Sequence, residues 1–396
     1  MIKLGNTSKT ILLILVIILC VLRSYSATRT ATSSGNWSNT ATWGGNPVPT
    51  ASDDVTINNG INVTVNAAAY CNTLTTANSG TLTISGTNTL TVTGLINMFR
   101  PSANNTSFTI AVGTGSLVAG ALTMNATTTT RNNIITISTG TVTINGTVTT
   151  GTTGCQFVFT GNGLLKFGGS FSGGPASLTA ANGTIEYTGT APVIQAFTGN
   201  YYNLVYSGNG TTANPSGNLN IQGNLLNTGG GTLNFYARNV SLSGTTVSNT
   251  IDGFTTTGTV TMSKTAGTAT FTGNVNASVL TINGSGGTLN LGTGLTHTVT
   301  GNWTRTNGTL DGGSSLLKIA GSVSGTGGSF AANTGTIEWN AAGAQTLAAV
   351  AYNNLILSGG GAKTMPAGTA ITNNLLINGP TASIAAGQNI SVGSLT

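Results

Sequence analysis

The chain has 396 residues, of which 5% are charged and 38% are hydrophobic, and its formal net charge is +6. This low charge, together with many β-branched residues, excludes a charged disordered chain and is typical of an all-β protein rich in turns. Three of the twelve basic residues fall in a leader, so nine remain against six acidic residues (12 − 3 = 9), and they form no cluster, which argues against a nucleic-acid partner.

Residues 1–26 are typical of a secretory signal peptide. Lys3 and Lys9 precede an unbroken apolar run at residues 11–22, which is too short to span a bilayer. Small residues at the −3 and −1 positions place the cleavage before Ala27, and an uncleaved anchor is the alternative. We expect no membrane span after cleavage and a location outside the cell or on its outer surface.

Residues 27–66 predict an N-terminal cap followed by the first strands. Trp37 and Trp43 precede a Pro-Val-Pro turn, and we expect their rings to cover the open end of a repeat fold. An acidic pair, Asp53-Asp54, then leads into two short alternating strands. The Asn-Asn-Gly turn at residues 58–60 between these strands is typical of a hairpin.

This stretch resembles the opening of the extracellular domain named for its eight glycines, and the starts of many secreted β-solenoid proteins of the Bacteroidetes. The resemblance rests on W-x5-W, then P-x-P, then the acidic pair before a V-x-I strand, all within residues 35–66. It implies an adhesin-like extracellular protein. Those relatives carry a C-terminal sorting domain for type IX secretion, so we expect the sequence to be a fragment that continues beyond Thr396.

A short repeat begins after Cys71. Thr-Leu-Thr recurs at residues 73–75, 81–83 and 89–91, every eight residues (81 − 73; 89 − 81). Each unit provides one strand and one turn, with Leu on one side and Thr on the other. Three units make about 24 residues, which predicts three-faced coils of a right-handed parallel β-helix (β-solenoid) over residues 67–396.

A longer repeat is a duplicated block, at residues 164–244 and 316–394. Leu164 matches Leu316, and Glu186 matches Glu338, both at an offset of 152 (316 − 164; 338 − 186). Duplication of a strand-rich block is the mark of a repeat architecture. A further Gly-Asn-apolar pattern recurs, and we expect its Asn side chains to bond along the stack at one corner. The pattern lies at residues 223–225, 273–275 and 301–303.

Catalysis finds little support in the residues. The two acids most alike, Glu186 and Glu338, lie several coils apart, whereas a glycosidase pair needs about 5–9.5 Å. For Asp53-Asp54 we favour a turn or strand-start role over calcium ligation, because no third acid is near in sequence. His297 is the only histidine, and we expect a structural role for it. We therefore predict no catalytic, cofactor-binding or metal-binding residues, no cofactor, and no enzyme activity.

Cys71 and Cys155 are predicted to be small core residues. They lie 84 residues apart (155 − 71), or about three and a half coils, which is roughly 17 Å at about 4.8 Å per coil. A disulfide requires Cα atoms within about 7 Å, so these two cysteines are not expected to pair.

The leading hypothesis is a secreted or cell-surface structural or adhesive β-solenoid that binds a glycan or a protein. Tyr201, Tyr202 and Tyr352 are candidate surface contacts, although packing between coils is an equal alternative for them. A polysaccharide-active β-helix enzyme, a lyase or a glycosidase, is the second hypothesis. Ice binding through Thr-x-Thr rows is a minor one, disfavoured because successive units are expected on different faces.

Overall fold

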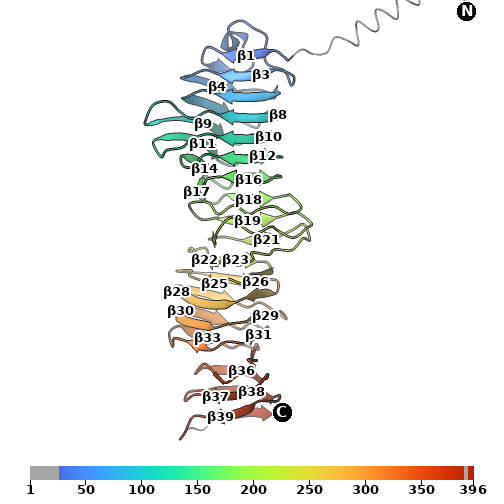
Figure 1. The fold of residues 1–396 in the computed structure, drawn as a ribbon, viewed down its shortest axis with the longest axis vertical. Helices are drawn as coiled ribbons and strands as arrows, with labels where there is room; N and C mark the ends of the chain where they lie inside the picture. Colours follow the sequence, from blue (N-terminus) through green and yellow to red (C-terminus); the bar gives the residue numbers. More distant parts are fainter. Residues whose placement is uncertain (1–25, 388–390) are drawn as a thin grey trace, which may run out of the picture.

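The structure is a computed structural model that describes residues 26–387 and 391–396. The chain forms one long rod of about 16 turns, with strands stacked in parallel along its axis (Figure 1). The prediction of an all-β parallel β-solenoid is therefore confirmed. Residues 1–25, which hold nearly all of the predicted signal peptide, lie outside the described residues. Within the described part, the one helical segment is a short 3-10 helix, η1 (Thr40–Trp43).

The largest sheet has 22 strands and folds over two faces of the rod, because several long strands turn a corner between them. Its strands are β1 (Thr28–Ala31), β3 (Asp54–Ile57), β5 (Ala69–Cys71), β6 (Thr73–Thr76), β8 (Thr89–Met98), β10 (Ser116–Met124), β12 (Thr141–Ile144), β13 (Val148–Thr150), β15 (Leu164–Phe167), β16 (Phe171–Gly173), β18 (Thr184–Tyr187), β19 (Asn203–Tyr206), β20 (Leu219–Ile221), β21 (Leu225–Asn227), β22 (Val240–Leu242), β23 (Ser248–Ile251), β25 (Thr259–Met262), β26 (Thr268–Phe271), β28 (Val279–Asn290), β30 (Trp303–Asp311), β32 (Val323–Ser324) and β33 (Ser329–Ala331).

Three smaller sheets complete the coils. The seven-stranded sheet contains β2 (Gly35–Asn36), β4 (Ile61–Val65), β7 (Gly80–Ile84), β9 (Thr106–Val112), β11 (Arg131–Ile137), β14 (Cys155–Phe159) and β17 (Ser177–Thr179). The eight-stranded sheet contains β24 (Phe254–Thr255), β27 (Val275–Ala277), β29 (Thr296–Val299), β31 (Leu316–Ile319), β34 (Thr336–Trp339), β36 (Ala351–Leu357), β38 (Ala370–Ile377) and β40 (Val392–Leu395). The last sheet contains β35 (Gln345–Thr346), β37 (Ala362–Met365) and β39 (Thr381–Ile384).

The eight-residue repeat marks three successive strands of one coil. The Thr-Leu-Thr units lie in β6, β7 and β8, and these strands belong to different ladders. Coil length varies along the rod more than this repeat predicts. Thr184 pairs with Asn203 of the next coil, an offset of 19 (203 − 184). Leu122 pairs with Val148, an offset of 26 (148 − 122). Loops at the corners absorb this difference while the strands keep their register.

The strands around residues 58–60 do not form the predicted hairpin. β3 pairs in parallel with β1 and β6, whereas β4 pairs with β2 and β7, so the two strands lie on different faces. Gly60 has φ +76° and turns the chain at the corner between them. The Asn-Asn-Gly turn therefore forms a corner of a coil, because the strands on either side of it pair with strands of neighbouring coils and not with each other.

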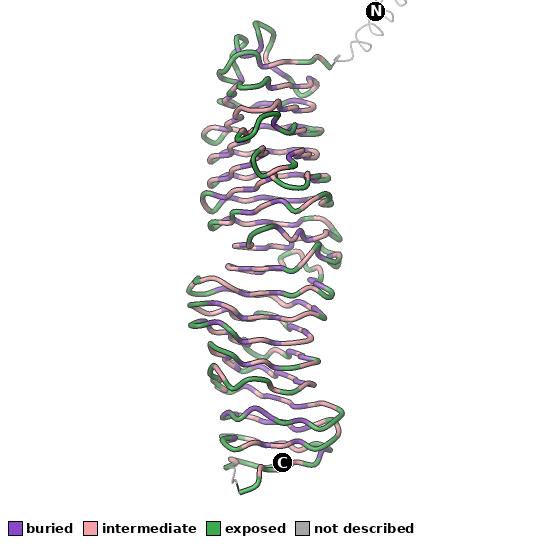
Figure 2. Tube along the Cα trace, turned by 60° about the vertical axis from the view of Figure 1, so that its left-hand side comes forward, coloured by how far each residue is buried: buried purple, intermediate pink, exposed green. Residues whose placement is uncertain are grey.

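The core is one continuous column inside the coils. Along each strand, buried and partly exposed residues alternate, as the pattern iBiB of Thr184–Tyr187 shows. Figure 2 shows this alternation in every turn, with exposed segments at the corners and ends. Leu82, the middle residue of its Thr-Leu-Thr unit, is fully buried. Stacked apolar side chains therefore hold successive coils together.

Asparagine side chains bond along the stack, as the Gly-Asn-apolar pattern predicts. Each side-chain oxygen accepts a hydrogen bond from a backbone N–H of the next coil, which satisfies a donor at a corner. The bonds, all 2.9 Å long, are Thr250 N–H to Asn224, Thr296 N–H to Asn274, and Ser322 N–H to Asn302.

The two N-terminal tryptophans pack together at the end of the rod. Their rings meet edge to face at 4.9 Å, and both are buried. The indole N–H of Trp43 donates to the carbonyl oxygen of Trp37 at 2.7 Å. Thr28–Ala31 already pairs in parallel with Asp54–Ile57, so the stacking of coils begins within the predicted N-terminal cap of residues 27–66. A search of the described residues finds no helix that is both long and apolar enough to cross a membrane.

Candidate functional site

Asp53 is held by the turn that precedes β3. Its carboxylate accepts hydrogen bonds from the N–H and the hydroxyl of Thr50, both at 2.8 Å, and from Ala27 N–H at 3.2 Å. Arg29 Nε lies 3.7 Å away. Burial by itself raises the pKa of Asp53, but these bonds and the Arg29 charge hold that pKa below its usual value. The predicted turn role is confirmed.

Asp54 is the first residue of β3 and faces outward. Its carboxylate accepts hydrogen bonds from the Thr73 hydroxyl at 2.7 Å, and from Asn72 Nδ2 and the Ser26 hydroxyl, both at 2.9 Å. The Thr73 bond is the main cause of a lowered pKa for Asp54. Among the residues that the structure describes, no group of three or more His, Cys, Asp or Glu side chains is arranged to hold a metal ion.

The two matched glutamates each join a ladder across three neighbouring strands. Glu186 pairs with Lys166 of the preceding turn at 2.9 Å and accepts a 2.6 Å bond from the Ser207 hydroxyl. Glu338 repeats this arrangement in the second copy. The carboxylates are partly buried, and each one bridges neighbouring strands of the ladder through charge-assisted hydrogen bonds.

His297 is a buried structural residue, as predicted. Its Nδ1 accepts from Val275 N–H at 3.1 Å, which makes Nε2 the protonated nitrogen that donates to the Leu291 carbonyl at 2.8 Å. Burial lowers the pKa of His297 more than the Leu291 bond raises it. Both ring nitrogens of the neutral imidazole are therefore occupied by backbone partners.

Two of the three candidate surface tyrosines are not on the surface. Tyr201 is 2% exposed and Tyr352 is 0% exposed, so the prediction of surface contact is wrong for both. The Tyr201 hydroxyl donates to the Gln195 carbonyl at 2.5 Å, and the Tyr352 hydroxyl donates to the Ala348 carbonyl at 2.8 Å. Each ring packs in the core, and its hydroxyl donates to a backbone carbonyl oxygen at a bend in the chain. This is the alternative of packing between coils that the sequence left open.

The cysteines are buried and free, as predicted. Burial raises the pKa of Cys71 to about 12, and it also raises the pKa of Cys155. Neither thiol therefore has the thiolate character of a reactive cysteine.

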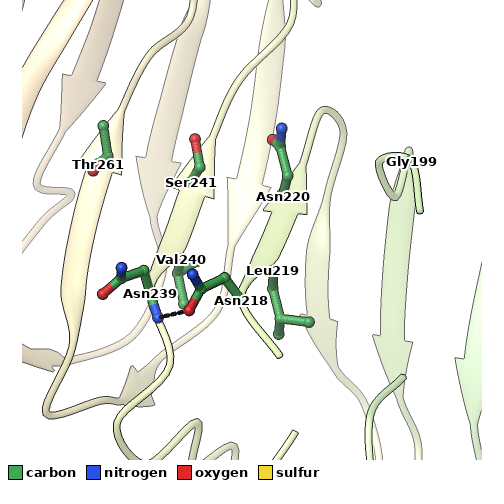
Figure 3. Close-up of a pocket in the computed structure, with 8 residues that line it drawn as sticks. All are labelled: Gly199, Asn218, Leu219, Asn220, Asn239, Val240, Ser241 and Thr261. Carbon is green, nitrogen blue, oxygen red and sulfur yellow. Dashed lines mark hydrogen bonds between the residues drawn. The ribbon is translucent and has the colours of Figure 1, made fainter. Parts of the chain in front are cut away.

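A hollow of about 220 Å³, lined by apolar as well as polar groups, lies on the outward face of β20, β22 and β25. Figure 3 shows Asn220, Ser241 and Thr261 in one row, one from each strand, with Asn218 and Asn239 in a second row. The backbone N–H of Asn239 donates to the Asn218 side-chain oxygen at 2.9 Å, which fixes that row. Such amides and hydroxyls both donate and accept, so the hollow suits a hydroxyl-rich ligand.

Tyr202 is the third candidate surface tyrosine. Tyr201 forms a parallel bridge with Ile221, so the next residue, Tyr202, lies on the outward side adjacent to the coil that holds Asn220. Tyr202 is partly exposed. It is the one tyrosine of the three that keeps its candidate role as a surface contact.

Neither this hollow nor the exposed aromatic side chains were predicted from the sequence. The signal was present, because Asn218 and Asn239 are 21 residues apart (239 − 218), one coil at this point of the rod. Tyr70 and Phe99 are each 49% exposed. Single aromatic residues without a repeat partner give no such periodic signal, so only the fold places them outside.

Two lysines are buried inside the coils, which the sequence pattern did not indicate. Lys264 Nζ donates to Asn249 Oδ1 at 2.6 Å and to the Ser243 carbonyl at 3.4 Å. Lys363 Nζ donates to two backbone carbonyls, those of Ala341 at 2.7 Å and Gly343 at 3.1 Å. Burial lowers the pKa of both lysines. Their ammonium groups close coil corners by satisfying carbonyl oxygens.

No family model, no curated protein and no solved structure matches this chain.

Proposed function

We propose that the protein is a secreted or cell-surface rod with a structural or adhesive role, which binds glycan or protein surfaces without catalysis. The observation that carries this proposal is the repetition of outward amides and hydroxyls at one-coil spacing, most clearly in the hollow of Asn220, Ser241 and Thr261. Each group binds weakly, but a rigid rod presents many of them at once. Multivalency then converts weak contacts into firm attachment.

The placement of the acids supports a non-catalytic role. The carboxylate of Asp252 joins two coils by accepting a bond from Asn227 N–H at 2.7 Å, and that of Asp311 holds a turn by accepting one from Gly313 N–H at 2.8 Å. Asp53, Asp54 and the two glutamates are bonded as described above. An enzyme of the lyase or glycosidase class needs acidic side chains that point at one substrate bond. Here the six acidic residues each hydrogen-bond to neighbouring groups at separate places along the rod. The enzyme remains the alternative hypothesis.

The outer location is also part of the proposal. It rests on the basic, apolar and small-residue pattern of residues 1–26 and on the resemblance to secreted β-solenoids of the Bacteroidetes. Expression in a Gram-negative host and fractionation of the cells test the location, with the uncleaved anchor distinguished by the N-terminal sequence of the exported protein.

Binding is tested with the purified protein against a panel of polysaccharides, with and without calcium. We expect retention on a polymer but weak binding of its monosaccharide. Thr261→Val removes one hydroxyl from the hollow and should weaken binding about three- to tenfold. Thr143→Val is the matched control, because Thr143 lies outside the hollow and is flanked by Val118 and Lys166 and not by amides or hydroxyls. Release of reducing or unsaturated ends would overturn the proposal in favour of an enzyme.

Ice binding keeps only a partial structural basis. On the outward face of β1, β3 and β6, each coil contributes a threonine at the same position. These threonines stack into a column along the rod, although successive Thr-Leu-Thr units of one coil lie on different faces. One column is Thr30, Thr56 and Thr75, followed by Asn97, Thr123 and Thr149. The column beside it is broken by Asp54 and Leu95. An ordered water lattice needs both columns regular, so we do not favour this function.

A further inference from the structure

A second hollow, of about 230 Å³, lies near the second copy of the duplicated block. Its walls are mostly apolar and include Val323, Leu347, Ala348 and Pro366. Arg305 is the one charged residue among those that line this space. The hollow therefore combines a fixed cation with a surface that favours hydrocarbon.

Arg305 has fewer hydrogen-bond partners than the two buried lysines, each of which has two. It is 9% exposed, and none of the ion pairs formed by the described residues involves it. Its Nη2 donates to the Gly328 carbonyl at 3.2 Å, and its guanidinium carbon lies 5.3 Å from the centre of the Trp303 ring. A buried cation without a counter-charge is costly. A planar guanidinium with free donors is suited to a carboxylate.

The first copy shows that this arrangement is not required by the coil. Gly173 and Gly325 match at an offset of 152 (325 − 173), and a Cβ on either would collide with the carbonyl oxygen of the residue below. That residue lies one turn before each copy and is Thr150 before the first and Arg305 before the second. Thr150 is satisfied, because its hydroxyl donates to the Gly174 carbonyl at 2.7 Å.

The first copy also fills this region with rings. Phe171 and Phe197 meet edge to face at 5.7 Å. Val323 takes the place of Phe171 at an offset of 152 (323 − 171). Phe197 stands four residues before Tyr201, and four residues before Tyr352 the chain has Ala348. The second copy thus has smaller side chains and one added guanidinium at the same place.

We propose that this hollow binds a small organic carboxylate, with Arg305 pairing to the carboxylate and the Leu347 and Pro366 walls contacting its hydrocarbon part. The carboxylate belongs either to an acidic sugar or to the C-terminus of a peptide, since both present the same group. This inference goes beyond the proposed function, because it concerns one enclosed site and not the repeated outward faces.

Isothermal titration calorimetry of the full-length protein at constant ionic strength tests the site. Isovalerate should bind saturably, and isovaleramide, its neutral isostere, should bind at least about tenfold more weakly. N-acetyl-leucine and glucuronate then separate the two sources, since the tighter of them identifies a peptide terminus or an acidic sugar. The proposal fails if none of the carboxylates binds, or if the amide binds as well as the acid.

Two variants locate the binding. Arg305→Met keeps the length of the side chain without its charge and should abolish isovalerate binding, while Ala349→Phe fills the exposed rim of the hollow and should do the same. Lys318→Met removes a cation from the outward ladder and is the control, with binding expected to stay unchanged. Circular dichroism confirms that each variant is folded. Isovalerate binding that survives both Arg305→Met and Ala349→Phe refutes the site, whereas retention on polysaccharide should be unaffected by either variant.

Discussion

The two copies of the duplicated block agree outside the rod and differ inside it. Outside, each presents a lysine, a glutamate and a serine on three neighbouring strands. The lysine–glutamate distance is 2.9 Å in the first copy and 3.4 Å in the second, and the serine–glutamate bond is 2.6 Å in both. The ladder consists of Lys166, Glu186 and Ser207 in the first copy, and Lys318, Glu338 and Ser358 in the second.

Inside the rod, the larger of two paired core residues lies in the later turn at one copy and in the earlier turn at the other. In the first copy Val148 pairs with Phe171, whereas in the second Trp303 pairs with Val323. A second exchange has the same form, with Phe157 beside Leu178 in one copy and Leu310 beside Phe330 in the other. The outer ladder depends on specific charged partners, but the core depends mainly on the volume that two adjacent turns supply together.

The largest expected effect tests this exchange. Trp303→Val should lower the free energy of unfolding by about 3 kcal/mol, because it leaves a cavity in a fully buried position. Adding Val323→Phe recreates the order found in the first copy and should recover about half of the loss. Urea unfolding followed by circular dichroism measures both. If the two changes simply add as separate losses, the turns do not share volume and the comparison is wrong.

The buried tyrosines should differ by a smaller amount. Tyr201→Phe leaves the Gln195 carbonyl without its donor and also removes the 3.0 Å contact with the Tyr187 hydroxyl. Tyr352→Phe removes the 2.8 Å bond to the Ala348 carbonyl and no hydroxyl–hydroxyl contact. We expect losses of about 2 and about 1 kcal/mol in the free energy of unfolding, respectively. Tyr202→Phe, on the partly exposed neighbour, serves as the control, and equal losses at Tyr201 and Tyr352 would contradict the difference between the networks.

A pH dependence between pH 7.5 and pH 5.5 should arise one turn before the second copy. His297 precedes Leu317 in its ladder, whereas the first copy has Val142 before Leu165. The folded pKa of His297 is lowered, so below about pH 6.5 the unfolded chain binds a proton that the folded chain does not. Stability should fall by up to about 1.4 kcal/mol per pH unit as pH drops below 6.5 towards the folded pKa.

The measurement is the urea midpoint at pH 7.5 and pH 5.5. His297→Val, which imitates the first copy, should remove most of the difference between the two midpoints. A wild-type midpoint that is the same at both pH values would show that His297 is protonated in the folded protein.

The outer ladder should give the smallest effect. Lys166→Met and Lys318→Met each remove a partly exposed ion pair, so we expect a loss of less than about 1 kcal/mol, reduced further by added salt. The first copy, with its shorter pair, should lose slightly more. Thermal unfolding at two salt concentrations measures this. A loss above about 2 kcal/mol in either copy exceeds the range of exposed ion pairs and would show a further role for the pair.

Much of the fold could be predicted because each coil repeats the same pattern. Leu82 and its eight-residue neighbours alternate with threonine, so the inward face follows from the side-chain period of a strand. The Asn224 corner follows from the need of a turn N–H for an acceptor. The prediction of a hairpin at residues 58–60 was wrong, because a glycine turn is compatible with two arrangements. The strand after the turn can pair with the strand before it, or with a strand of a neighbouring coil.

The parallel β-solenoid, its duplicated block, the structural role of His297 and the unpaired cysteines follow from the amino-acid sequence alone, since these depend on periodicity and on separation along the chain. The packing of the coils was needed to show that Tyr201 and Tyr352 point inward while Tyr202 points out, and that Arg305 lines a hollow where the first copy has phenylalanine rings. These features depend on which residues of neighbouring coils share one volume. Coils of unequal length shift that register in a way that no fixed period in the sequence reveals.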